Sequence, residues 1–204
     1  MPDETSTDPV TSPRDEVAAG TGPVEHPPRR SRRRALVEWG SIVVVALLIS
    51  FLLRTFVIQT FYIPSGSMEP TLMIGDRIIV SKLSVTWGTI HRGDIIVFKH
   101  PPAEHCGEPV TDLVKRVIGL PGNHLTSRGN TIYVNGKPLD QTWSHTEPLG
   151  TPIGNVTVPA NSYFVMGDNQ SDSCDSRFWG FVPRHDIIGK AFLRIWPLSR
   201  FGFL

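Results

Sequence analysis

Hydrophobic and polar positions divide the chain into three stretches of different character. The first 34 residues contain no Leu, Ile, Phe or Trp, and such a segment cannot bury enough apolar area to offset the entropy of ordering. No charged residue occurs from Trp39 to Leu53, and counting on to Ile58 past Arg54 gives 20 positions, about one bilayer core of helix. After Tyr62, short β-branched runs alternate with turn residues, which is typical of an all-β domain.

These stretches predict three parts of a single-pass protein of the cell membrane. We expect a disordered cytoplasmic tail over residues 1–35, a transmembrane signal anchor over 36–60 and an extracytoplasmic domain over 61–204. Five Arg residues between positions 29 and 34 precede the apolar run, and a basic flank of this kind stays in the cytoplasm. A cleaved secretory signal would need small residues at a processing site, but bulky residues follow Arg54.

Short apolar runs bounded by turn residues predict the strands of the third part. The runs are Arg77–Ser81, Asp94–Lys99, Asp112–Ile118, Thr131–Val134, Tyr163–Met166 and Ala191–Trp196. Asn135-Gly136 is a signal for a type I′ hairpin. Gly75-Asp76 and Gly93-Asp94 each precede a run containing Ile-Ile-Val, which indicates a shared turn before a strand. The stretch from about 123 to 159, rich in Gly, Thr, Asn and Pro, indicates a small insertion on the main sheet.

Composition and charge narrow the classes of partner and fold. The chain has 20 basic and 19 acidic residues and a net charge of +1, which argues against a nucleic-acid partner held by bulk charge. Two cysteines are too few for a disulfide scaffold. Cys106 and Cys174 both fall in the translocated, oxidising part, so a disulfide between them is allowed, but the sequence does not establish the pairing.

A serine pair directly after the anchor is the first candidate for chemistry. In Ile63–Leu72, Ser65 and Ser67 flank a glycine in a turn bounded by prolines. Such a turn can expose a hydroxyl beside free backbone N–H groups, as a nucleophile and its oxyanion hole require. Alone, the pattern is also that of a linker. Neither a Gly-x-Ser-x-Gly elbow nor a His-Glu-x-x-His metal motif is present.

Lys115 is a candidate base for such a serine. Period-two alternation in its strand puts Lys115 on the same face as Leu113 and Val117, while Arg116 points the other way. Desolvation on an apolar face would lower the pKa of the amine from about 10.4 toward neutrality, so that it could accept a serine proton. The alternative is that Lys115 is a solvent-facing residue of a half-buried strand.

A polar loop between Met166 and Gly180 is the third candidate. It fails the EF-hand pattern because Gln170 and Ser173 occupy positions that need a carboxylate or Asn and a Gly. We expect Asp175 and Arg177 to pair, and the Ser173 hydroxyl to orient a nearby amine.

Together these segments resemble the bacterial type I signal peptidases, membrane-anchored serine proteases that remove signal peptides from exported preproteins. The resemblance covers the anchor and nearly all of the chain after it. It rests on Pro-Ser-Gly-Ser-Met-x-Pro-Thr-Leu, Gly-Asp-x-x-x-Phe, Lys-Arg-x-x-Gly-Leu-Pro-Gly and Gly-Asp-Asn…Asp-Ser-Arg-x-Trp-Gly, in family order. Gln170 departs from the family, where many members have a basic residue. The resemblance implies antiparallel sheets in a partly closed, barrel-like arrangement.

The resemblance also implies roles for individual residues. Ser67 would be the nucleophile and Lys115 its general base, and the Ser65 hydroxyl would form an oxyanion hole with the backbone N–H of Ser67. Ser173 would orient the lysine amine. Further roles fall to two sets of residues: Asp175 and Arg177 would brace the loop, and Ile63, Met68 and Val114 would line the substrate pocket.

The implied partners are membrane lipid and secretory preproteins with small residues at the first and third positions before the cut. No cofactor, metal or nucleic acid is expected, and we expect a monomer. A Ser-Lys autoprotease of the repressor-cleaving type is disfavoured by the anchor and by the lack of a DNA-binding head. A membrane-tethered binding module without catalysis remains the alternative from another class, and it would not need a lysine on an apolar strand face.

Overall fold

The computed structural model describes residues 32–52, 57–103, 106, 110–143 and 148–204. The predicted disordered tail lies outside these residues except for its last four, which begin helix α1 (Arg32–Leu52). The described side chains of α1, from Leu36 onward, are all exposed. Within the described ranges, no helix combines the length and the hydropathy expected of a membrane span.

The helix ends earlier than the predicted anchor. α1 ends at Leu52, whereas residues 58–60, which the prediction included in the anchor, belong to strand β1 (Ile58–Tyr62). All five residues of β1 pair with strand β2 (Arg77–Ser81) in antiparallel register. The prediction ran too far because a short apolar run has the same composition in a helix as in a strand, and here pairing with β2 decides between them.

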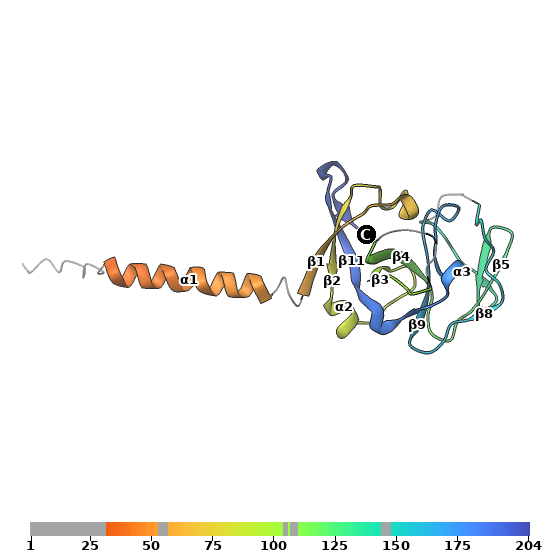
Figure 1. Ribbon diagram of the computed structural model, residues 1–204, viewed down its shortest axis with the longest axis horizontal. Coiled ribbons are helices and arrows are strands. Elements are labelled where there is room, and N and C mark those ends of the chain that lie inside the picture. Colours follow the sequence, from red (N-terminus) through yellow and green to blue (C-terminus); the bar gives the residue numbers. More distant parts are fainter. Residues whose placement is uncertain (1–31, 53–56, 104–105, 107–109, 144–147) are drawn as a thin grey trace, which may run out of the picture. The chain divides into compact units, whose positions relative to one another are not determined.

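One antiparallel sheet of eight strands forms most of the domain that starts at β1 (Figure 1). Its strand order is β1-β2-β11-β3-β4-β9-β10, and β12 pairs with β11. The further strands are β3 (Ile95–Lys99), β4 (Asp112–Gly119), β9 (Ser162–Met166), β10 (Val182–Pro183), β11 (Ile187–Trp196) and β12 (Gly202–Phe203). The all-β prediction is confirmed, but the barrel-like closure is not: among the described strands, the end strands β1 and β10 do not pair with each other.

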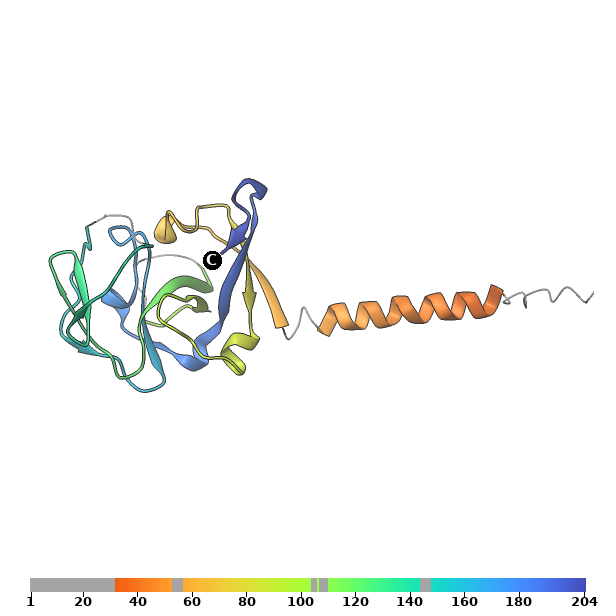
Figure 2. The same cartoon turned by 180° about the vertical axis from the view of Figure 1, so that it is seen from behind.

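A second sheet of four strands lies between residues 124 and 157, inside the stretch that the sequence set apart as an insertion. Its strands are β5 (His124–Arg128), β6 (Thr131–Val134), β7 (Lys137–Pro138) and β8 (Val156–Thr157), in the order β7-β6-β5-β8. Asn135 and Gly136 have φ of 52° and 78°, which confirms the predicted type I′ hairpin. Figures 1 and 2 show β5 and β8 at the opposite end of the domain from β1 and β2.

Short helices and turns connect the strands. They are η2 (Gly66–Met68), α2 (Leu83–Thr86), α3 (Ser176–Trp179), η3 (Arg184–Asp186) and η4 (Leu198–Arg200). The two Gly-Asp turns share one geometry, because Gly75 and Gly93 each have φ of 93°. The following aspartates, Asp76 and Asp94, each accept a bond at 2.9 Å from the backbone N–H three residues earlier. The predicted shared turn is therefore confirmed.

Strand β4 runs through the centre of the core. It pairs with β3 on one side and with β9 on the other, and its residues from Lys115 to Gly119 are all buried. Val117 and Ile118 belong to two different buried apolar clusters, and Val114 packs against a third. A side chain on the middle of β4 is therefore surrounded by the interior of the domain.

Candidate active site

The serine-rich segment follows β1 and forms the short 3-10 helix η2, which is one turn long. Ser65 precedes this turn in an extended conformation, with φ of −126° and ψ of 159°. On either side the chain is anchored in the core, because the side chains of Ile63 and Met68 are only 2 % and 1 % exposed. Ser67 lies between these two buried residues and is itself half-buried. Its hydroxyl is therefore held on a fixed turn without being sealed from solvent.

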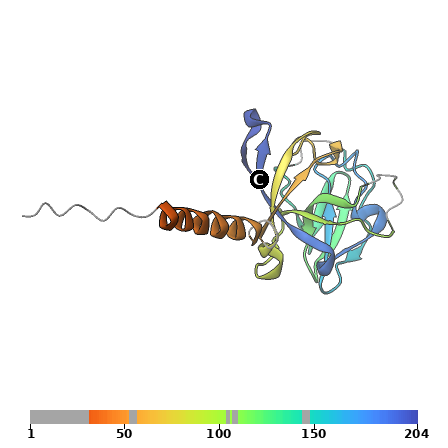
Figure 3. The ribbon, with the colours of Figure 1, turned by 60° about the vertical axis from the view of Figure 1, so that its left-hand side comes forward.

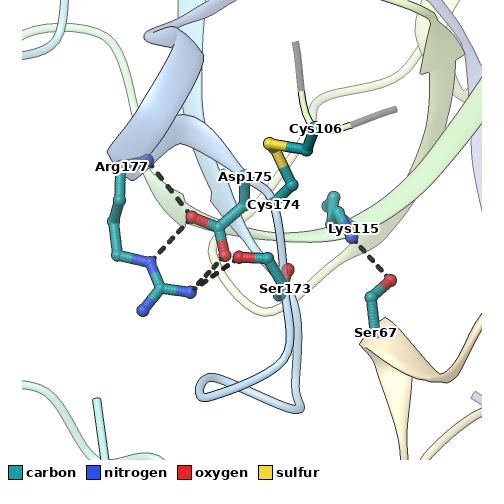
Figure 4. Close-up of a disulfide and its surroundings, with 7 residues drawn as sticks. All are labelled: Ser67, Cys106, Lys115, Ser173, Cys174, Asp175 and Arg177. Atoms are coloured by element: carbon teal, nitrogen blue, oxygen red, sulfur yellow. Dashed lines mark hydrogen bonds and ion pairs between the residues drawn. A yellow bond between two sulfur atoms is a disulfide. The ribbon is translucent and has the colours of Figure 1, made fainter. Parts of the chain in front are cut away.

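Lys115 meets this turn from strand β4. Its side chain is 3 % exposed, and its Nζ donates a hydrogen bond of 2.5 Å to Ser67 Oγ, 48 residues away in the sequence (Figure 4). Leu113 and Val117, which alternation assigned to the same face, are buried as well. The solvent-facing alternative for Lys115 is therefore wrong, and the structure brings the predicted base to the predicted nucleophile.

Ser65 lies next to Ser67 on the same turn. The two hydroxyl oxygens are 3.5 Å apart, and either can donate to the other. Ser65 thus presents a hydroxyl beside the predicted nucleophile, as an oxyanion hole requires.

Asp175 and Arg177 form the predicted pair and brace the polar loop from inside. Asp175 has no exposed surface. Its Oδ1 accepts bonds from the backbone N and the Nε of Arg177 at 3.1 and 2.8 Å, and its Oδ2 accepts from Arg177 Nη2 at 2.7 Å. The same Oδ2 accepts from the backbone N of Gly167 at 3.1 Å. Arg177 also donates to the carbonyls of Gln170 and Leu149, so the pair ties the loop to itself and to the insertion.

Ser173 lies in the site but does not make the predicted bond. Its side chain is buried, and its Oγ makes no hydrogen bond within the described part of the chain. A Cβ built on Gly167 would lie 2.3 Å from both Ser173 Oγ and Ser67 O. Because both distances start from one point, these two oxygens lie at most about 4.6 Å apart. The structure thus brings Ser173 to the nucleophile turn and leaves its bond to Lys115 unformed.

Gly167 and Asn169 are two site residues whose contacts the sequence did not predict. Asn169 donates from its backbone N to Ser67 O at 3.1 Å and from its Nδ2 to Gly66 O at 3.3 Å. Gly167 permits this approach because its Cα has no side chain to collide with Ser67. Both belong to the Gly-Asp-Asn motif that carried the family resemblance, so the motif located them without showing their function.

Arg116 and Asp168 form a buried ion pair beside the catalytic candidates. Arg116 Nε and Nη2 donate to the two carboxylate oxygens of Asp168 at 2.7 and 2.6 Å. Arg116 follows Lys115 in the sequence, and Asp168 follows Gly167, so the pair joins β4 to the start of the polar loop. Period-two alternation predicted that Arg116 points away from the face of Lys115, but it did not predict that Asp168 is its partner.

The C-terminal hairpin of β11 and β12, which projects from the sheet in Figure 3, secures the turn after Ser67. Arg200 Nη1 donates to both oxygens of Asp76 at 3.0 and 3.1 Å, and Arg194 Nη1 donates to Thr71 O at 2.6 Å. Burial and the neighbouring Arg200 lower the pKa of Arg194, and Asp76 acts in the opposite direction.

Two adjoining pockets share Ser65, Ser67, Leu113 and Lys115 in their walls. The first is completed mainly by apolar side chains and includes all three predicted pocket residues: Phe61, Tyr62, Ile63, Pro64, Met68, Val110, Asp112 and Val114. The second is completed by Gly66, Cys106, Asp172 and Cys174. Cys106 and Cys174 form a disulfide, which the sequence allowed but did not establish. No group of three or more His, Cys, Asp or Glu side chains among the described residues could hold a metal ion.

Comparison with known families decides the identity of the chain. The family described as signal peptidase, peptidase S26, matches residues 36–196. The chain belongs to the signal peptidase family. It is therefore a serine protease, and the alternative of a binding module without catalysis finds no support.

Individual signal peptidases resemble the chain over half of its length or more. A probable signal peptidase I-2 from Synechocystis sp. is 43% identical over 168 residues, which cover 82% of this chain and 77% of that protein. A signal peptidase I from Leptolyngbya laminosa is 42% identical over 171 residues, with 83% and 84% covered. A crystal structure of a signal peptidase I from Enterococcus faecalis is 33% identical and has a TM-score of 0.40, covering 50% of this chain and 96% of that one.

In this signal peptidase, the backbone of Gly167 lies so close to Ser67 that a side chain at position 167 should impair activity. In Gly167→Ala, the new Cβ would lie 2.3 Å from a backbone oxygen of the nucleophile turn, so the turn must move. We expect kcat to fall by about 100-fold or more, because small displacements of reacting groups are costly. Gly154→Ala is the matched control, since nothing lies within 4 Å of its added Cβ. Steady-state kinetics of both folded variants test this, and full activity in Gly167→Ala would contradict it.

Proposed function

We propose that this signal peptidase cleaves signal peptides with Ser67 as its nucleophile and Lys115 as its general base. The single observation behind this assignment is the 2.5 Å hydrogen bond between Lys115 Nζ and Ser67 Oγ in a setting where the lysine is 3 % exposed. Desolvation favours the neutral amine, which can accept a hydroxyl proton across such a distance. Among the described residues, Ser67 Oγ forms hydrogen bonds with Ser65 and Lys115.

In the acylation step, Ser67 Oγ attacks the scissile carbonyl carbon while neutral Lys115 takes the hydroxyl proton. The resulting ammonium then gives that proton to the leaving amine as the C–N bond breaks, and the signal peptide remains as an ester on Ser67. In deacylation, Lys115 takes a proton from water, the hydroxide attacks the ester, and the proton returns to Ser67 Oγ. Protons therefore balance over the cycle, and these steps require no metal.

Two further serines complete the proposed machinery. The Ser65 hydroxyl and the Ser67 backbone N–H would donate to the oxyanion, and the 3.5 Å separation of the two hydroxyls supports this. Ser173 would orient the Lys115 amine. Its buried Oγ has no hydrogen bond to a described residue, so it keeps both its donor and its acceptor for that amine. Asp175 and Arg177 would hold Ser173 by bracing the loop on which it lies.

The first pocket would accept the residues that precede the cut. Ile63, Met68 and Val114 lie in its wall beside Ser67, and the first two are almost fully buried, so they cannot move aside for a large side chain. We therefore assign the preference for small residues at the first and third positions before the cut to steric rejection in this pocket.

The assignment of the dyad predicts the behaviour of three variants. Ser67→Ala, Lys115→Ala and the double variant should each lose at least about 1,000-fold in kcat, with the double variant no worse than the singles, because the two residues act as one unit. Cleavage of a preprotein with an Ala-x-Ala site by the detergent-solubilised full chain measures this.

Matched controls are available on the surface. Lys99→Ala and Ser199→Ala remove exposed residues of the same types, and both should cleave as the wild type does. A preprotein with Trp immediately before the cut should resist all forms of the enzyme. Full activity in either folded single variant of the dyad would overturn the assignment.

We also propose that α1 anchors the protein in the cell membrane, with the N-terminus in the cytoplasm and the β domain outside. The apolar side chains of α1 are spread around the helix rather than along one face, which is typical of a helix surrounded by apolar material. No charged residue occurs from Trp39 to the helix end at Leu52. Because Lys115 and Ser67 meet within a single chain, we further propose that the enzyme acts as a monomer.

The anchor has a direct test in bacterial cells that express the full chain. The protein should stay with the membrane pellet after an alkaline carbonate wash, and protease added outside the cytoplasmic membrane should digest its β domain. A chain that starts at residue 57 should be released by the same wash. Release of the full chain would contradict the proposal.

A further inference from the structure

A disulfide joins two segments of the active site that are distant in the sequence. Cys106 lies in the connection between β3 and β4, and Cys174 lies in the polar loop just before α3. The two residues are 68 positions apart, and their Cα atoms are separated by 6.2 Å. The described part of the chain contains no free cysteine.

This bridge is part of the wall of the site. Both of its residues line the second pocket together with Gly66, Ser67 and Lys115, and Figure 4 shows it beside the dyad and the Asp175–Arg177 pair. The neighbours of Cys174 in the chain are Ser173 and Asp175. A shift of Cys174 therefore moves the residue proposed to orient Lys115.

The other contacts of the polar loop secure different sides of it. Asn169 bonds to the nucleophile turn, and Arg177 bonds to Asp175 and to carbonyls of the loop and the insertion. Ser173 Oγ makes no hydrogen bond with a described residue, so no side-chain bond of its own holds it in place. Arg177 Nη2 donates to the Ser173 carbonyl at 3.3 Å, and the covalent bond at the next residue links this part of the loop to Cys106.

We propose that the Cys106–Cys174 disulfide is a positioning element of the active site, which holds Ser173 and the pocket wall against Lys115 and makes turnover depend on an oxidised bridge. This inference rests on the proposed function of Ser67 and Lys115. The disulfide does not touch the bond that is cut; it acts through the loop.

The disulfide can be opened and closed by thiol–disulfide exchange. A dithiol reductant supplies two electrons and two protons, the S–S bond breaks, two thiols remain on the enzyme, and the reductant becomes a cyclic disulfide. Cys106 is exposed and Cys174 is half-buried, so a small thiolate can reach the bridge. A small disulfide, such as oxidised glutathione, reverses the change by accepting the same two electrons and two protons and becoming two thiols.

The test compares the oxidised full chain, the chain reduced by dithiothreitol, and the double variant Cys106→Ala/Cys174→Ala, all in detergent. Thiol labelling confirms the redox state, and circular dichroism confirms that each form is folded at the assay temperature. We expect kcat per folded molecule to fall about tenfold on reduction, with KM changed less than about twofold, because a displaced positioning group slows the chemical step. The double variant should be equally slow and insensitive to the reductant, and re-oxidation should restore the wild type.

Full kcat in a reduced, folded enzyme with two labelled thiols would overturn the proposal. The disulfide would then only stabilise the fold. Loss of activity only in proportion to unfolded molecules would overturn it as well. Failure of the proposed function looks different: the oxidised wild type would then not cleave, or Ser67→Ala would cleave as well as the wild type.

Discussion

A lysine amine buried beside a serine hydroxyl is the constraint on which the structure of this signal peptidase depends. Water stabilises an ammonium strongly, so the site must be built by elements that keep water away from Lys115. Strand β4 does this because it pairs with β3 and β9 and sends side chains into three apolar clusters. The Lys115–Ser67 bond of 2.5 Å forms at the edge of that interior.

Ser67 reaches Lys115 because separate segments converge on its turn. Asn169 bonds from the polar loop to the carbonyl of Ser67. Arg200, in the C-terminal hairpin, bonds to Asp76 and to the carbonyl of Pro70, which follow Ser67 in the chain. Gly167 allows the backbones to approach, since any side chain there would collide with Ser67 O. Each of these contacts links residues that are more than 90 positions apart in the sequence.

The distance between segments also explains what could be predicted from the sequence. Six of the strands follow from short apolar runs bounded by turn residues, and the face of Lys115 follows from period-two alternation. The Asp175–Arg177 pair was predictable because it joins residues two positions apart. The roles of Gly167 and Asn169, the Arg116–Asp168 pair and the Cys106–Cys174 bridge depend on approaches through space that no local pattern encodes. The end of the anchor was misplaced for a related reason, because Ile58–Tyr62 becomes a strand only through its pairing with β2.

The pH dependence of kcat/KM tests the central claim most directly, because the ammonium form of Lys115 cannot accept the Ser67 proton. With a preprotein that carries an Ala-x-Ala site, kcat/KM should fall as pH decreases and rise as Lys115 loses its proton, and a chelator should not change the curve. A rate that is independent of pH from about 5 to 10, across the range where histidines and lysines titrate, would contradict a lysine base and the mechanism derived from it.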